Sequence, residues 1–124
     1  MDSTPLALKA AQILYDRKAL DILALSVGHL TIIADCLVIA SGRSALQVKT
    51  LANDVEDRLA AENIRPRRIE GHHEGRWIVM DYQTMILHLF HPEERAYYHL
   101  ERLWEDGSNR LTLPFSQEDE TSSI

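Results

Sequence analysis

The sequence predicts a single α/β domain: one mixed sheet of about five strands with helices packed on it. Three observations favour this fold class. Apolar residues recur at spacings of three and four in three segments, the period of an amphipathic helix. Five shorter segments are apolar throughout or alternate between apolar and polar residues, which is typical of strands. The two kinds of segment are interspersed along 124 residues, a length that suits one domain.

Two helices have clear ends in the sequence. Thr4 followed by proline is a favourable helix start, and this helix is predicted to run to about Lys18. A longer helix is predicted from about Ser44 to Glu62, with an apolar stripe on one side. Asn63 closes it, and a proline lies just beyond this stop.

Two strands are predicted between these helices, at residues 21–27 and 36–40. The second is almost continuously apolar, which indicates an internal strand buried on both faces. The only cysteine, Cys36, lies in this run, so it has no partner for an internal disulfide and is expected to be a buried small apolar residue. The connection between the strands is expected to place three apolar side chains against the core: Leu30, Ile32 and Ile33.

The second half of the chain is predicted to hold three strands and one helix. Residues 67–71 carry charges typical of an edge strand. A last helix is predicted to start at His91-Pro92, with two acids in its first turn, and to continue to Trp104. We expect the folded domain to span residues 1–106 and the acidic remainder, residues 107–124, to be disordered.

A hairpin between these elements is the most informative stretch. With Gln83-Thr84 as a two-residue loop, one face is wholly apolar and is expected to be core. The opposite face pairs Trp77 with Phe90 and combines large aromatic rings with an acid and an imidazole. The core face comprises Ile78, Met80, Tyr82, Met85, Leu87 and Leu89; the opposite face comprises Trp77, Val79, Asp81, Ile86, His88 and Phe90.

Composition limits the partners. The net charge of −6 disfavours direct nucleic-acid binding, which depends on basic contacts to phosphate, and favours a basic protein partner. The sequence contains no long apolar segment that predicts a membrane span, and its N-terminus lacks a signal peptide's pattern. A cytoplasmic protein that does not bind membranes is therefore expected.

Three possible chemical sites each have a structural explanation. The Ser41–Ser44 turn before a helix could hold a phosphate, but simple helix capping explains the same residues. Asp81 and His88 lie diagonally on one hairpin face, where a structural hydrogen bond is favoured over catalysis because no nucleophile completes the pair. The six histidines show no convergent set of three or four ligands, so no metal site is predicted.

Trp77, Phe90 and Tyr98 leave two interpretations open. A helix could cover them, in which case the rings belong to the core. Alternatively they form an exposed aromatic patch, and aromatic residues are over-represented among those that carry protein–protein binding energy. Periodicity alone does not separate the two.

Five sequence strings, in this order, resemble the ribosomal silencing factor family, also called Iojap. The match covers roughly residues 6–105, and two departures stand out: Cys36 replaces a usual aromatic, and Gln83-Thr84 replaces a commoner Gly-Asp turn. The strings are ADCLVIASGRS (34–44), VKTLA (48–52), EG (70–71), GRWIVMDY (75–82) and HLFHPEERAYYHLERLW (88–104).

The resemblance implies a nucleotidyltransferase-like topology and a translation repressor without enzymatic activity, catalytic residues or cofactor. It implies binding to the large ribosomal subunit through ribosomal protein number fourteen, which sterically blocks joining of the small subunit during starvation, with little direct nucleic-acid contact. A homodimer of the free protein is also implied. The alternative is a nucleotide-binding or nucleotidyltransferase-like enzyme that uses the Ser41–Ser44 turn. The partner-binding residues carried over from the matching motifs are Trp77, Met80, Asp81, Tyr82, His88, Phe90 and Tyr98.

Overall fold

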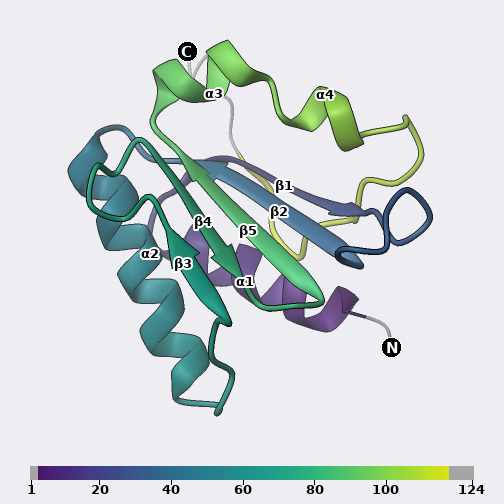
Figure 1. Cartoon of the computed structure of the whole chain (residues 1–124), viewed down its shortest axis with the longest axis horizontal. Helices are drawn as coiled ribbons and strands as arrows, with labels where there is room; N and C mark the ends of the chain where they lie inside the picture. The colour runs from purple at the N-terminus through teal and green to yellow at the C-terminus, as the bar shows by residue number, and fades with distance from the viewer. Residues whose placement is uncertain (1–2, 118–124) are drawn as a thin grey trace.

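The chain folds around a five-stranded mixed sheet, shown by a computed structural model that describes residues 3–117 (Figure 1). The strands follow the order β1-β2-β5-β4-β3; β2 and β5 run parallel and the other neighbours antiparallel. The predicted fold class is confirmed. The strands are β1 (Leu20–Ser26), β2 (Cys36–Ser41), β3 (Arg68–Glu70), β4 (Trp77–Asp81) and β5 (Met85–Phe90).

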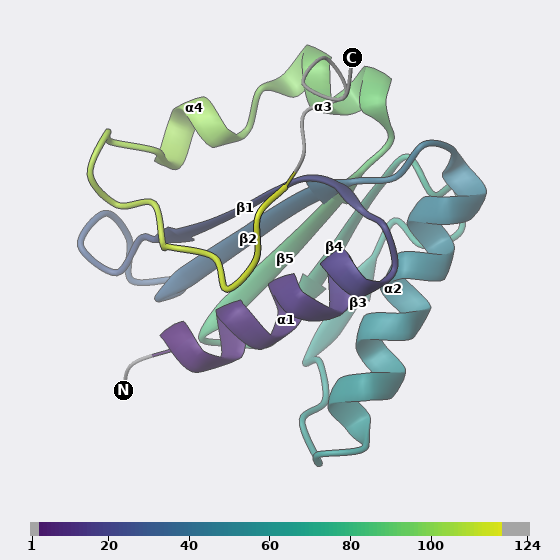
Figure 2. The same ribbon diagram turned by 180° about the vertical axis from the view of Figure 1, so that it is seen from behind.

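The helices lie on both sides of this sheet. α1 packs across β1 and β2, and α2 packs across β4 and β5, so these two helices cover one face (Figure 2). α3 and α4 lie on the other side (Figures 1 and 2). Among residues 3–117, no helix has the length and apolar character needed to cross a bilayer. The helices are α1 (Thr4–Asp16), α2 (Ala45–Ala60), α3 (Pro92–Tyr98) and α4 (Glu101–Trp104).

The hairpin has the predicted register. Trp77 pairs with Phe90, Val79 with His88, and Asp81 with Ile86. Gln83 adopts a φ of +77°, and the Tyr82 N–H donates to the Met85 carbonyl at 2.9 Å, which closes the two-residue turn. All six side chains of the predicted core face are buried, in the cluster that α1 and α2 cover.

The internal strand β2 and its cysteine also match their predictions. All six residues of β2 are buried, as expected for an internal strand covered on both faces. Cys36 is 2% exposed and belongs to the core cluster beneath α1 and α2. The long helix α2 begins as predicted, because the Ser44 side chain accepts a hydrogen bond from the Gln47 N–H at 3.1 Å.

Two local predictions are wrong. The last helix is broken into α3 and α4, because His99 adopts the left-handed conformation at φ 48° and ends α3. The β1–β2 connection does not tuck its apolar residues inward. Leu30, Ile32 and Ile33 are 46%, 104% and 64% exposed.

The C-terminal segment up to Gln117 packs on the domain, where the sequence predicted disorder. The Leu111 N–H donates to the Ala24 carbonyl of β1 at 2.8 Å, and the ring of Phe115 stacks on Tyr15 of α1 with centroids 4.2 Å apart. The Gln117 side chain both donates to and accepts from the backbone of Ile22. This segment therefore covers the outer edge of β1. The predicted tail continues through residues 118–124, which lie outside the described residues.

Candidate functional site

The sheet face opposite α1 and α2 is only partly covered. Beneath α3 and α4, a second apolar cluster joins β1, β2 and β5 to Leu100 and Trp104. The covering helices have no fully buried residue of their own, and Leu100, in the link between them, is 9% exposed. Toward β4 and β3 the face stays partly accessible. We call this region the open strip; its residues, all of intermediate exposure, are Trp77, Val79, Asp81, Ile86 and His88.

A stack of aromatic rings leads from the core to the surface at one end of the open strip. Phe90 is fully buried, and the ring of Trp77 stacks on it with centroids 4.8 Å apart. Tyr98 of α3 also contacts Trp77, with ring centroids 4.7 Å apart, and is 49% exposed. Tyr97, which is 81% exposed, meets Tyr98 edge to face. Each of the two interpretations therefore holds for a different ring: Phe90 belongs to the core, and Tyr98 lies at the surface.

His88 bonds to Trp77 and not to Asp81. The Trp77 Nε1–H donates to His88 Nδ1 at 3.0 Å. Burial lowers the pKa of His88 to about 4, so the imidazole is neutral at physiological pH. The expected structural contact between Asp81 and His88 is wrong, because a competing partner is available to each side chain.

Asp81 instead belongs to a charged pair at the far end of the strip. Arg67 donates to its carboxylate at 2.8 Å, and the Gln83 N–H donates to it at 2.7 Å. Burial opposes ionisation of Asp81, but these hydrogen bonds outweigh it and lower the pKa of the carboxyl group. A shallow hollow opens beside this pair, lined by Arg68, Glu70, Val79 and Asp81.

The first turn of α3 is tied to the start of β4. Arg76 donates to both carboxylate oxygens of Glu94, at 2.5 and 2.7 Å, and to Glu93 at 3.2 Å. The hydrogen bonds from Arg76 lower the pKa of Glu94. This contact fixes the N-terminal end of α3 beside the start of β4.

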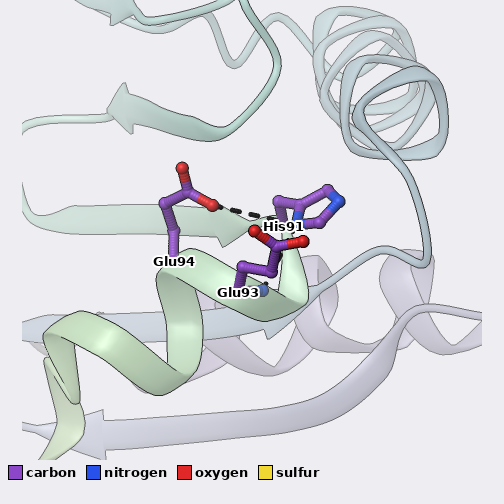
Figure 3. A group of neighbouring side chains, drawn as sticks. All are labelled: His91, Glu93 and Glu94. Carbon is purple, nitrogen blue, oxygen red and sulfur yellow. Dashed lines mark hydrogen bonds and ion pairs between the residues drawn. The ribbon is translucent and has the colours of Figure 1, made fainter.

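Three side chains in this turn could in principle hold a metal ion, as Figure 3 shows for His91, Glu93 and Glu94. One ligand atom from each lies within 4.8 Å of the others. However, His91 Nδ1 already accepts the Glu93 N–H at 3.2 Å as a helix cap, and the Arg76 guanidinium pairs with both carboxylates. The arrangement is explained by capping and ion pairing.

Arg95 holds the middle of α3 against the sheet. Its guanidinium donates to Glu101 of α4 at 3.0 Å, to the Ser41 hydroxyl of β2 at 2.9 Å and to the Asp21 carbonyl of β1 at 2.9 Å. The Arg95 side chain is only 12% exposed. One largely buried cation thus links both covering helices to two strands. Sequence reasoning missed the roles of Arg76, just before β4, and Arg95 in α3, since charged residues normally indicate a solvated surface.

The Ser41–Ser44 turn functions as a helix cap. The Gly42 N–H donates to the Phe90 carbonyl, and the Arg43 N–H donates to the Gln47 side chain at 2.6 Å. Ser41 is paired through β5 with the start of β4, whereas Asp81 lies at the end of β4, about 13 Å further along the strands. A nucleotide-bound metal ion at the turn would therefore be out of reach of Asp81.

The structure separates the seven predicted partner-binding residues into two groups. Trp77, Asp81, His88 and Tyr98 are at least partly accessible. Met80, Tyr82 and Phe90 are 0%, 7% and 0% exposed, so these side chains support the strip from beneath. Tyr97 was not predicted as a partner-binding residue. Its position beside Tyr98 in the sequence was the signal that could have identified it.

Comparison with known proteins gives a consistent result. Residues 1–123 match the family model described as "Ribosomal silencing factor during starvation". The chain is 42% identical over 102 residues to the ribosomal silencing factor RsfS of Zymomonas mobilis, covering 82% of this chain and 76% of that protein. It is 38% identical over 92 residues to RsfS of Bacillus subtilis, covering 74% and 78%. A crystal structure of a Chromobacterium violaceum protein superposes with a TM-score of 0.81 at 31% identity, covering 94% of this chain and 95% of that one.

Proposed function

The chain belongs to the ribosomal silencing factor family, a family of non-enzymatic translation regulators that silence ribosomes during starvation, and we propose that it acts by steric blockade. In this proposal the protein binds the large ribosomal subunit through ribosomal protein number fourteen. The bound protein then occupies the surface on which the small subunit would dock. This mechanism requires no chemical step and therefore no nucleotidyltransferase activity.

The observation that carries this proposal is the accessible Trp77–Tyr98 pair at the edge of the open strip. Aromatic side chains offer large contact areas at little entropic cost, and they dominate many protein–protein interfaces. Phe90 stacks on Trp77, and the hydrogen bonds that anchor α3 hold the helix that carries Tyr98. A preformed surface loses less conformational entropy on binding.

Charge supports a protein partner of basic character. The net charge of −6 favours encounter with such a partner and disfavours contacts to RNA phosphates. Micromolar affinity corresponds to about −8 kcal/mol and nanomolar affinity to about −12 kcal/mol. A few well-packed aromatic anchors at the centre of an interface supply a large part of such energies.

The proposed contact residues are Trp77, Asp81, His88 and Tyr98, with Met80, Tyr82 and Phe90 holding their backbone and ring positions. We also propose that the free protein forms a homodimer through the same strip, so that dimerisation and ribosome binding compete. A cytoplasmic location completes the proposal.

The test is co-sedimentation with purified large subunits. Tyr98→Ala and Trp77→Ala are expected to abolish binding while the circular dichroism spectrum stays close to that of the parent protein. Leu46→Ala is a matched control, because Leu46 is 74% exposed on α2, on the opposite side of the sheet, and its loss should leave binding unchanged.

The same variants should fail to inhibit subunit joining when small subunits are added, and binding to isolated ribosomal protein number fourteen should be lost in parallel. Retained binding by both aromatic variants would refute the interface. Unfolding of both variants would show instead that these rings serve mainly as core.

A further inference from the structure

The hydrogen bond between Trp77 and His88 fixes where the imidazole carries its proton. An indole nitrogen can only donate, so the 3.0 Å contact requires His88 Nδ1 to be the acceptor. A neutral imidazole has one acceptor nitrogen and one donor nitrogen. The proton of His88 therefore resides on Nε2, and Trp77 acts as the group that selects this tautomer.

The Nε2–H group of His88 is accessible. It has no hydrogen-bond partner within residues 3–117, and it is not among the buried polar atoms that lack one. His88 is a residue of intermediate exposure, so the solvent access of this donor is limited.

The surroundings of His88 are apolar and neutral. In the sheet it lies between Val79 on β4 and Ile39 on β2. The charged groups further along the face are already paired, Arg67 with Asp81 and Arg68 with Glu70. The lowered pKa of His88 is consistent with this setting, since burial disfavours the charged imidazole.

We propose that His88 determines specificity in the docking surface by donating its Nε2–H to an uncharged carbonyl oxygen of the partner, with the tautomer held by Trp77. The carbonyl belongs to a backbone peptide or to a side-chain amide. This inference rests on the proposed function, because it concerns the same surface.

The geometry also explains which chemical groups of a partner would bind poorly at His88. A lysine or arginine of a basic partner has only donors, and His88 has no accessible acceptor left to receive one. A carboxylate would lose its hydration beside Val79 without a cation to replace it. A carbonyl oxygen has a lone pair for the donor and a smaller desolvation cost.

The tautomer is measured first, by ¹⁵N NMR of the histidine rings in the free protein at pH 7. We expect His88 to show one unprotonated Nδ1 and one protonated Nε2. Trp77→Phe keeps an aromatic ring beside Phe90 but removes the donor, so the population of this tautomer should fall toward that of a free neutral imidazole. Trp104→Phe is the matched control, since the side chain of Trp104 is not bonded to His88. Protonation of Nδ1 in the parent protein would overturn the inference.

The docking role is measured by titrating large subunits with His88 variants. His88→Leu should weaken binding about tenfold, the upper range of one neutral hydrogen bond. His88→Gln can accept from Trp77 and still donate, so it should bind within about threefold of the parent protein. Equal binding by the leucine variant would overturn the inference while leaving the proposed function intact. Failure of the parent protein to bind large subunits would overturn both.

Discussion

On one face of the sheet, α1 and α2 bury a continuous apolar cluster; on the other, α3 and α4 cover only the β1-β2-β5 side. The first contact is made by apolar stripes on two long helices. The second relies on Leu100, Trp104 and the hydrogen bonds of Arg95. The same sheet therefore has one face built for stability and one whose surface is left available for contact.

The difference also separates neighbours along a single strand. In β5, Leu87 and Leu89 point into the first cluster and are fully buried, whereas Ile86 and His88 lie on the second face with intermediate exposure. Alternation places them on opposite sides. Residues one position apart are thus expected to respond to substitution in different ways.

The largest contrast is expected between Leu87→Ala and Ile86→Ala. Leu87 is 0% exposed, and its truncation leaves a cavity in the first cluster that should destabilise the fold by about 2–5 kcal/mol. Ile86 is already partly hydrated, so its truncation should cost about 1 kcal/mol. Urea unfolding measures both. Equal losses would show that the two faces contribute alike and would remove the basis of the comparison.

A smaller effect, confined to the second face, is expected from Arg95→Met. This change leaves the Glu101 carboxylate without its cation, and one oxygen of that group is already buried without a partner. Neither side chain is fully buried, so the cost should be about 2 kcal/mol. Hydrogen exchange should accelerate in α3 and α4 and stay slow in β2 and β5.

Arg102→Met is the control for this variant, because Arg102 is exposed on α4. It should leave both stability and exchange unchanged. Uniform acceleration across the whole sheet in the Arg95 variant would mean that the two faces unfold as one unit.

The same contrast explains what the sequence could predict. Strong periodicity identified the buried faces of α2, β4 and β5, because many apolar side chains follow one pattern there. It also set the hairpin register, since a shift by one residue would expose the whole core face. The sequence motifs identified the family and assigned the aromatic residues to partner binding.

The second face depends on single long-range contacts that leave no periodic signal. The break at His99, the choice of Trp77 over Asp81 as partner for His88, and the bonds from Arg95 each join residues distant in sequence or select between near neighbours. The docking of Phe115 on Tyr15 is of the same kind. A polar C-terminal composition hid this contact, and disorder was predicted in its place.

The smallest expected effect is a pH dependence that distinguishes His88 from surface histidines. The pKa of an unfolded histidine is about 6.5, and burial lowers that of His88 to about 4. Between these values the unfolded chain binds a proton that the folded chain does not, so stability is full above about pH 6.5 and declines as the pH falls toward 4. Solvent access to the ring reduces the effect, and we expect a loss of about 1–2 kcal/mol in the free energy of unfolding between pH 7 and pH 5.

Urea unfolding across this range should show that the dependence of stability on pH is flatter in His88→Gln. The dependence should be retained in His73→Gln, because His73 is exposed. An unchanged slope in the His88 variant would mean that the ring titrates as freely as a surface histidine, and the open strip would then be more hydrated than its burial indicates.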